Sequence, residues 1–400
     1  MAEPAGALRI GLPAALALLW SAPAAAYPWM ISHKYTSCSQ CHIDPSGGSA
    51  LTSYGRGLGQ QLLPMGGGED AEHTPGKEKD FLMGAVELPK WLTLQVDGRG
   101  LGFPQPNLDD NGDISSWSPR FILMQADLRA AVTAGPIVAY ASAGGVSEGA
   151  QAAWFTSNEA GWNAVARDYW LGWKAAKGVL VRAGRMNLPF GIRTEEHTQY
   201  VRSATRTNTN ADQQAGVAVA VQKKGLRGEL MGIAGNPQVA PDAYRERGYS
   251  GFVALSPNTS VEVGASSLFA AVEADVATLA PRKRQAHGAF TRWTPAPRVA
   301  VLAEADVLHA NDDGTASTGA AALAEVDWEA VQGLHLRGIG QYCDTDFKDS
   351  DDGVATGWAA AQWFVLPRVD LRIDALHGTL NCAPGAQASW YALGQVHFFL

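Results

Sequence analysis

The sequence has few charged residues and few cysteines for its length. Only 18% of the 400 residues are Asp, Glu, Lys or Arg, below the roughly 25% of an ordinary soluble protein. Four cysteines are too few for a disulfide-rich scaffold. The 39 acidic residues against 31 basic ones, a net charge of −8, argue against nucleic acid as a partner. A hydrophobic share of 46% excludes an intrinsically disordered chain.

Long apolar segments are also missing from most of the chain. Beyond residue 26, no stretch reaches the roughly 18 uninterrupted apolar residues that indicate a transmembrane helix. The mean hydropathy of −0.09 is too polar for a helical membrane bundle. Glycine is abundant, with 44 residues, and no low-complexity run accounts for it. Such a chain has to bury its apolar side chains or turn them toward lipid.

The first 26 residues have the layout of an export signal. Arg9 supplies a positive charge, residues 10–20 form a short apolar run, and Ala24-Ala25-Ala26 supplies a cleavage site. The alternative is an N-terminal membrane anchor, but the apolar run is shorter than the roughly 20 residues that span a bilayer. We therefore predict a cleaved signal peptide over residues 1–26 and an exported protein.

The segment Cys38-Ser39-Gln40-Cys41-His42 is a C-x-x-C-H motif, which in an exported protein is typical of c-type haem attachment. The two thiols can each form a thioether to the porphyrin, and the adjacent imidazole can ligate the iron. The alternatives are a disulfide, a redox dithiol and half of a zinc site. No βαβ pattern and no second pair of zinc ligands surrounds the motif. The motif predicts one covalent haem c, bound by Cys38, Cys41 and His42.

The sequence offers two candidates for the second, distal ligand of the haem iron. Met30 and His33 precede the motif, and Met65 and His73 follow it. His33 lies close enough in sequence to wrap around the haem edge. Residues 51–63 predict a short amphipathic helix that could fold back and present Met65, a ligand type that raises the reduction potential. The prediction is His33 or Met65, with an open coordination position as the third alternative.

The N-terminal part of the exported chain is too short to build a large core. Below roughly 70 residues a domain needs a staple, and a covalent haem is one. Its faces would give Leu51, Tyr54, Leu58 and Leu62 a surface to pack on. Glycine-rich, polar residues follow at 66–79. We predict a monohaem cytochrome c-like module over residues 27–75 and a linker over residues 76–90.

From residue 91 to residue 400 the sequence alternates apolar and polar residues. Residues 124–130, 299–307, 324–329 and 369–375 show this period of two, which is typical of strands with one polar face. Each segment has about 10 residues, the length that a tilted strand needs to cross a bilayer. Tryptophans near the segment ends predict aromatic girdles: Trp91, Trp170, Trp173, Trp293, Trp328, Trp358, Trp363 and Trp390.

The connections between these segments alternate in length, as in outer-membrane barrels. The breaks give about 16 segments, an even number as bacterial barrels have. The last segment, residues 390–400, is similar to the closing strand of such proteins, although it ends in Leu400. We predict a mainly β fold, an antiparallel transmembrane β-barrel of about 16 strands over residues 91–400, with a soluble β-sandwich or solenoid as the alternative. The tight turns are expected at 133–135, 175–177, 223–225, 257–259, 294–297, 330–332 and 366–368.

Charged residues predict the character of the barrel interior. The length of residues 187–213 suits a loop folded into the pore, where basic and inward acidic residues would face each other as in a porin constriction. The alternative is ordinary solvated charges. The basic residues are Arg182, Arg185, Arg193, Arg202 and Arg206, and the inward acids are Glu304, Asp306, Glu325, Asp327, Glu329, Asp370 and Asp374. A further hypothesis is an Fe²⁺ path along Asp344, Asp346, Asp349, Asp351 and Asp352, because oxygen ligands suit hard cations.

The remaining cysteines and histidines lie in the predicted barrel. Cys343 and Cys382 fall at the long-loop ends of neighbouring strands, and an exported protein can form a disulfide there. The histidines are interpreted as residues of the lumen or of interfaces, and not as further haem ligands: His197, His287, His309, His335, His377 and His397.

Two short segments carry a resemblance to a known family. Tyr35-Thr36-Ser37-Cys38-Ser39-Gln40-Cys41-His42 is followed by Leu51-Thr52-Ser53-Tyr54-Gly55-Arg56. This arrangement, ahead of a barrel of this size, resembles the fused outer-membrane monohaem cytochrome c–porins of iron-oxidising bacteria. The resemblance implies that the haem module caps or plugs the pore, that Fe(II) is oxidised near the outer surface, and that electrons pass to periplasmic carriers.

Two functions follow from these expectations. The first is electron transfer across the outer membrane, between an extracellular donor or acceptor and a periplasmic carrier such as a soluble cytochrome; with Fe(II) as donor, the protein would be an iron:cytochrome oxidoreductase. The second is a solute porin with a regulatory or sensory haem module. In both, the barrel contacts outer-membrane lipid, and the haem module lies on the periplasmic side or in the lumen.

Overall fold

The computed structural model describes residues 27–65, 81–108, 114–148, 161–196, 198–380, 382 and 388–400. The predicted signal peptide, residues 1–26, lies outside the described residues. So do His73, His197 and the boundary between the predicted module and linker at residues 75 and 76.

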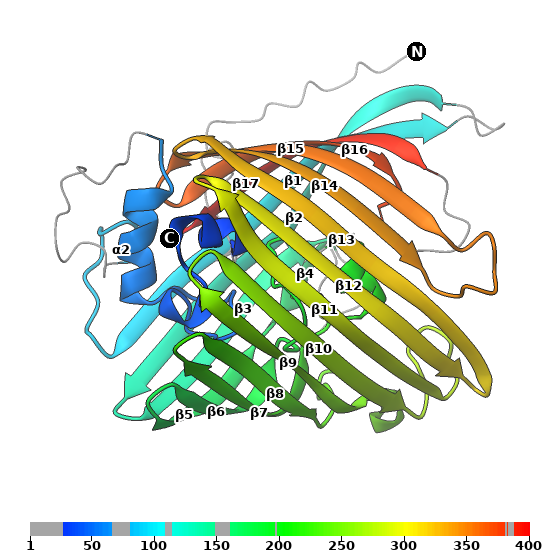
Figure 1. Ribbon diagram of the computed structural model, residues 1–400, viewed down its shortest axis with the longest axis horizontal. Helices are drawn as coiled ribbons and strands as arrows, with labels where there is room; N and C mark the ends of the chain where they lie inside the picture. The colour runs from blue at the N-terminus through cyan, green and yellow to red at the C-terminus, as the bar shows by residue number, and fades with distance from the viewer. Residues whose placement is uncertain are drawn as a thin grey trace, which may run out of the picture.

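The described chain is dominated by one closed antiparallel sheet (Figure 1). Its strands are β1 (Leu92–Leu108), β2 (Ile114–Ala134), β3 (Ile137–Ser147), β4 (Trp162–Val165), β5 (Tyr169–Ala176), β6 (Val179–Met186), β7 (Gln214–Lys223), β8 (Leu226–Ile233), β9 (Arg247–Asn258), β10 (Val261–Val272), β11 (Arg282–Ala296), β12 (Val299–Asp312), β13 (Thr315–Val331), β14 (Leu334–Asp344), β15 (Val354–Leu366), β16 (Val369–Gly378) and β17 (Ser389–Phe399). They follow in sequence order, and each pairs with the next except β4, since β4 and β5 both pair with β3.

The barrel has 16 strands that cross it, because β4 and β5 both pair with β3 and together make one interrupted crossing. The sheet closes where β17 pairs with β1, with Phe399 opposite Asp97. At this seam the backbone amide of Val96 donates to the carbonyl of Leu400, at 2.9 Å, and the amide of Leu400 donates back, at 3.0 Å. The predicted 16-stranded barrel and its tight turns are confirmed.

The period of two in the sequence separates the two faces of the barrel wall. In β16, Ile373 is 71% exposed, whereas its neighbours Arg372 and Asp374 are 3% and 0% exposed. Charged side chains therefore point inward and apolar ones outward, the reverse of a soluble protein. Each predicted inward acid is buried in this way.

The tryptophans that were predicted to form girdles are exposed, with two exceptions. Trp91, Trp173 and Trp390 are exposed on the barrel exterior, as girdle residues are. Trp170 and Trp358 are buried, and the prediction that they belong to the girdle is wrong. They occupy inward positions of their strands, where each ring lies against a guanidinium, at 5.1 Å for Trp170 and Arg182 and at 5.2 Å for Trp358 and Arg372.

The long loops gather at one end of the barrel. At this end a disulfide joins Cys343 of β14 to Cys382 of the β16–β17 connection. Their Cα atoms are 5.8 Å apart, and the bridge confirms the prediction. The β8–β9 connection contains the short 3₁₀ helix η4 (Asp242–Tyr244), and the β6–β7 connection contains α3 (Tyr200–Ala204).

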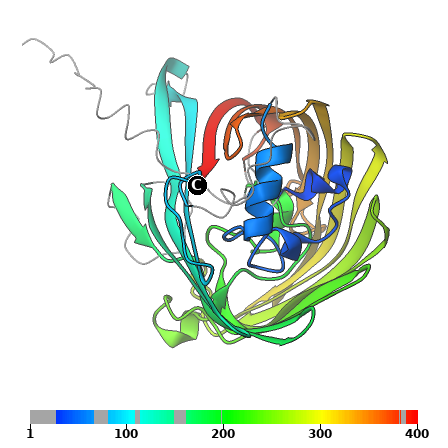
Figure 2. The same ribbon diagram turned by 90° about the vertical axis from the view of Figure 1, so that its left-hand side faces the viewer.

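The N-terminal segment sits inside the opposite mouth, at the short-turn end (Figure 2). It consists of two 3₁₀ helices, η1 (Pro28–His33) and η2 (Cys38–Gln40), and the helix α2 (Ser53–Leu62). The hydroxyl of Thr52 caps α2 by accepting from the amide of Gly55, so a helix forms within the predicted 51–63 segment. No helix among the described residues is long and apolar enough to span a bilayer.

Candidate functional site

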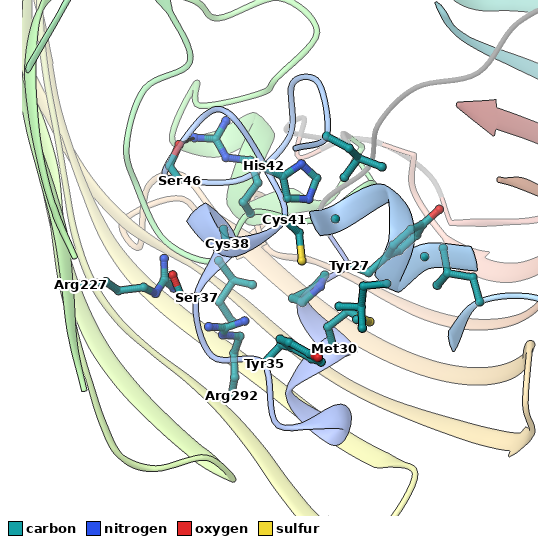
Figure 3. Close-up of a pocket in the computed structure, with 18 of the residues that line it drawn as sticks. Tyr27, Met30, Tyr35, Ser37, Cys38, Cys41, His42, Ser46, Arg227 and Arg292 are labelled. Atoms are coloured by element: carbon teal, nitrogen blue, oxygen red, sulfur yellow. Dashed lines mark hydrogen bonds between the residues drawn. The ribbon is translucent and has the colours of Figure 1, made fainter. Parts of the chain in front are cut away.

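The C-x-x-C-H motif folds as a single tight turn. The amides of Cys41 and His42 both donate to the carbonyl of Cys38, at 3.1 and 2.9 Å. This turn directs Cys38, Cys41 and His42 toward one cavity (Figure 3). The two thiols are free and not joined to each other. The structure thus brings the three predicted haem-binding residues to one space.

The opposite side of this cavity is mostly apolar. Leu51, Leu58 and Leu63 contribute from helix α2 and its ends, and Phe399 contributes from the last strand. Tyr54 and Leu62, which the sequence also assigned to the haem face, are not in the lining. Tyr54 is 52% exposed, and its hydroxyl contacts that of Tyr35 at 3.0 Å.

Helix α2 is held directly against the motif. The amide of Thr52 donates to the carbonyl of Cys41 at 2.8 Å, and Leu51 forms a β-bridge with His42. Gly55 faces the same peptide: a Cβ atom there would overlap the Cα, carbonyl carbon and oxygen of Cys41. The glycine of the Leu-Thr-x-aromatic-Gly-Arg segment is therefore required for the close approach of α2 to the cysteines.

The protonation states suit a haem site. Burial lowers the pKa of His42 to about 4, so the imidazole is neutral at physiological pH. Its Nδ1 atom is buried and has no hydrogen-bond partner among the described residues. Burial also raises the pKa of Cys41 to about 11, with a smaller contribution from nearby Cys38. A neutral imidazole and two thiols on one apolar cavity are the groups that a covalently bound haem requires.

The predicted distal ligands lie away from this cavity. The Nε2 atom of His33 is 3.2 Å from a carboxylate oxygen of Glu329. Met65 is 48% exposed, and its backbone amide donates to Phe364. Neither residue lines the cavity, whereas Met30 does (Figure 3). Pro28 begins η1, and that turn of helix brings Met30 to the cavity. The pattern of an aromatic and a proline before Met30 was the sequence signal for this turn.

Basic side chains surround the polar side of the cavity. Arg227 and Arg292 both bind the single carboxylate of Glu262, at 2.7 and 2.8 Å, so the three side chains together keep one positive charge. Arg193 donates to the hydroxyl of Ser46 at 2.7 Å. Its second terminal nitrogen, Nη1, is buried without a hydrogen-bond partner among the described residues.

Barrel side chains anchor the N-terminal segment in the mouth. Asp44 pairs with Arg182 at 3.1 Å, and the hydroxyl of Ser37 donates to Gln222 at 2.7 Å. The ring of Trp29 lies 4.0 Å from that of His335. Because these partners come from different sides of the wall, the segment is fixed across the opening and not attached along one edge.

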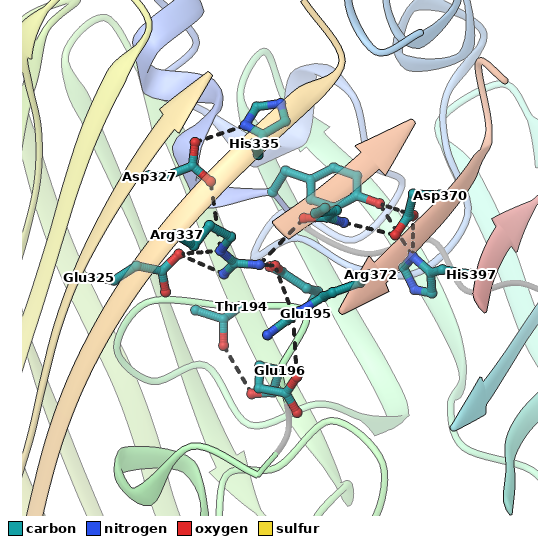
Figure 4. A network of polar contacts seen from close by, with 12 residues as sticks. Thr194, Glu195, Glu196, Glu325, Asp327, His335, Arg337, Asp370, Arg372 and His397 are labelled. Atoms are coloured by element: carbon teal, nitrogen blue, oxygen red, sulfur yellow. Dashed lines mark hydrogen bonds and ion pairs between the residues drawn. The ribbon is translucent and has the colours of Figure 1, made fainter. Parts of the chain in front are cut away.

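The described residues of the 187–213 loop fold into the lumen, on the long-loop side of the N-terminal segment, as predicted. Glu195 binds Arg337 of β14, which also binds Glu325 of β13 at 2.6 Å (Figure 4). Glu196 pairs with Arg99 at 3.1 Å and with Arg372 at 3.4 Å. This set of contacts, which we name the lumen network, ties the loop to the part of the wall that runs from β13 through β16 to β1.

The lumen network corrects one expectation. Facing basic and acidic walls were expected, as in a porin constriction, but most of the charges are directly paired, with Arg185, Arg193 and Asp306 as exceptions among the described residues. Arg202 binds Glu304, and Arg182 binds Glu229 as well as Asp44. Pairing is favoured because a buried charge without a partner is costly. The sequence could not show which basic residue reaches which acid.

The histidines and outer acids take the following places. His335 and His397 are in the lumen, bound to Asp327 at 2.8 Å and Asp370 at 2.6 Å. His287 and His377 are exposed. In the acidic β14–β15 loop, carboxylates accept hydrogen bonds from the loop itself, as Asp352 does from Thr345. Among the described residues, no group of three or more His, Cys, Asp or Glu side chains is arranged to hold a metal ion.

Comparison with solved structures shows that the barrel has the fold of porins. The chain is similar to OmpT of Vibrio cholerae, with a TM-score of 0.56, 10% identity, and coverage of 77% of this chain and 97% of that one. An anion-selective porin from Comamonas acidovorans has a TM-score of 0.54, 13% identity, and coverage of 77% and 98%. The outer membrane channel DcaP of Acinetobacter baumannii has a TM-score of 0.55, 10% identity, and coverage of 77% and 97%. The fold is porin-like. No family model and no curated protein matches the sequence.

We expect Gly55→Ala to impair assembly of the site, because the added methyl group would push α2 away from Cys41. The measurement is haem content per barrel after expression with the cytochrome c assembly machinery, where we expect a loss of about tenfold. Gly59→Ala in the same helix is the matched control, since its Cβ would make only ordinary contact with Leu63 at 3.4 Å. Equal haem content in both variants would refute the role of Gly55.

We expect Arg337→Ala to release the loop of residues 187–213. Removing one partner of a buried ion pair costs about 3–5 kcal/mol; Glu325 would lose Arg337, and Glu195 would keep only Arg372, at 3.8 Å. Trypsin should then cleave folded protein within the loop, at Arg193, Arg202 or Arg206. Arg298→Ala, at an exposed turn, serves as control. Resistance equal to that of the parent protein would contradict the tethering role.

Proposed function

We propose that this protein transfers electrons at the outer membrane through one haem c held by Cys38, Cys41 and His42. One observation carries the proposal: both thiols and the neutral imidazole converge on a single apolar cavity, within a segment seated in the mouth of a porin-like barrel. The C-x-x-C-H motif, in a chain with an export signal, supports haem over other groups.

An outer-membrane location fits the wall of the barrel. Its exterior is apolar, with exposed tryptophans, and its interior is charged. Short turns of such barrels face the periplasm, so the N-terminal segment would enter from that side. This orientation agrees with export through a cleaved signal peptide over residues 1–26.

The residues of the cavity would hold and shield the haem. Cys38 and Cys41 would fix it covalently, and His42 would ligate the iron. The leucines of α2 would exclude water from one face. Arg193, with its unpartnered Nη1, would donate to one of the haem carboxylates. When bound, the haem supplies reversible one-electron chemistry.

The contents of the lumen favour electron transfer over solute transport. The N-terminal segment and the loop of residues 187–213 lie one behind the other across the barrel, joined by the bond from Arg193 to Ser46. The lumen network pairs the charges that would otherwise attract permeating ions. Electrons need no water-filled passage, whereas solutes do.

Fe(II) is the extracellular donor that the family resemblance implies, and it would be a substrate of the protein. The β14–β15 loop, at the end far from the N-terminal segment, is rich in Asp and offers the oxygen ligands that suit a passing hard cation. With this donor, the activity is that of an iron:cytochrome oxidoreductase.

The test uses holoprotein in liposomes that enclose an electron acceptor. We expect a reductant added at the long-loop side to reduce the enclosed acceptor, and the protein to show a c-type α-band. Cys38→Ala/Cys41→Ala should abolish both signals but leave the barrel folded. Solute conductance with no electron transfer by the haem-loaded protein would instead support a porin with a sensory haem. Absence of haem from protein made in cells that assemble cytochromes would refute the proposal.

We further propose Met30 as the distal ligand, because it lines the cavity and the two residues expected from sequence do not. Loss of a thioether ligand lowers the haem reduction potential. Met30→Leu should therefore lower the potential and remove the methionine-to-iron charge-transfer band of the ferric spectrum. Met65→Leu and His33→Gln are matched controls that should leave both unchanged. A normal spectrum in Met30→Leu, with a changed one in either control, would assign the ligand elsewhere.

A further inference from the structure

A second hollow, which we name the mouth groove, opens beside the motif at the short-turn end. Its volume is about 1690 Å³. One wall is the N-terminal segment, through Ser39, His42 and Ser53. The other wall is the barrel rim, through the start of β1 and the β5–β6 turn. His42 lines both this groove and the cavity at the C-x-x-C-H motif.

The barrel side of the mouth groove is cationic. Lys90, Lys174 and Lys177 line it and are exposed. Further exposed basic residues extend around the same rim: Lys34, Lys223, Lys224 and Arg298. Among the described residues of this end, Glu87 is the only exposed acid. The excess of positive charge is local, because the whole chain carries −8.

The opposite end of the barrel has a different balance. Exposed acids there include Asp242, Asp313, Asp349 and Asp351, which are interspersed with exposed bases such as Lys348. The cationic rim is therefore a property of one end only. Fixed charges of one sign around a concave site attract partners of opposite sign and raise their association rate by 10-fold or more, an effect that salt weakens.

Because His42 lines the mouth groove, the cationic rim would attract a partner toward this residue. A partner seated in the mouth groove would lie against the residue that is proposed to ligate the iron. Complexes between electron-transfer proteins are typically small and transient, below about 1,200 Å² of buried surface. A groove with a cationic rim and a lining that includes apolar residues such as Ile43 and Pro45 is suited to such a complex.

We propose that the mouth groove is the docking site of a soluble electron-carrier protein with an acidic face, which Lys90, Lys174 and Lys177 attract to the His42 edge of the site. The proposal rests on the proposed function. The docking proposal adds the sign of the partner's surface charge and the part of the rim that the partner contacts.

The experiment measures binding and electron exchange separately, in nanodiscs of zwitterionic lipid. The probes are two soluble monohaem cytochromes c, one with an acidic surface and one with a basic surface, as in the mitochondrial protein. We expect the acidic probe to bind and exchange electrons faster than the basic one at low ionic strength, and salt to remove most of the difference. Faster exchange with the basic probe would overturn the proposal.

The variant K90E/K174E/K177E should weaken binding of the acidic probe and slow electron exchange with it, each at least about tenfold. Its haem content and reduction potential should match the parent protein. The control K283E/K348E reverses exposed lysines at the long-loop end and should leave both rates unchanged. Equal effects of the two variants, or none, would overturn the docking site.

Two further arms separate this proposal from its alternatives. The haem-free variant Cys38→Ala/Cys41→Ala should still bind the acidic probe, because the rim does not depend on the haem. If the parent protein bound the acidic probe but carried no haem, the proposed function would be refuted and the docking site would remain. If the K90E/K174E/K177E effect appeared only in discs with anionic lipid, the lysines would bind lipid headgroups, and the docking site would be refuted.

Discussion

The cost of leaving charged side chains unpaired inside a closed barrel shapes the rest of this structure. The alternation that turns Ile373 outward turns Arg372 and Asp374 inward, where water is scarce. Each inward charge then needs a partner. Partners on the wall, on the loop of residues 187–213 and on the N-terminal segment meet most of this need. The lumen therefore holds many polar contacts beside a buried apolar cluster that includes Phe190, Tyr200 and Leu268.

The same constraint explains how a short segment can keep a defined shape. The apolar side chains of residues 27–65, such as Trp29 and Leu51, pack in a small cluster that they share with Phe364 and Phe399 of the barrel. Polar contacts with wall residues such as Arg182 and Gln222 hold the segment in addition. The close contact of Gly55 with Cys41 then sets α2 as one wall of the cavity. The barrel thus supports the site from outside, and the proposed haem would complete it from within.

The two ends of the barrel differ in a way that suits electron transfer between a partner at the long-loop end and a partner at the short-turn end. The proposed redox site, the mouth groove and the cationic rim share the short-turn end. Acid-rich loops and the Cys343–Cys382 disulfide occupy the other end. A donor that is a hard cation and a carrier with an acidic face would each meet the matching surface. The loop of residues 187–213 lies between them.

The sequence alone determined the features that depend on short-range patterns. Alternation of apolar and polar residues predicted the 16 strands, alternating loop lengths predicted the two ends, and Cys38, Cys41 and His42 were marked by their spacing. Contacts between distant parts of the chain were decided only by the tertiary structure. The inward positions of Trp170 and Trp358 depend on strand register, which moves a side chain to the other face with a shift of one residue. The pairing of Glu195 with Arg337, and the presence of Met30 at the cavity where His33 and Met65 were expected, depend on how a folded loop and a seated segment meet the wall, which no local pattern encodes.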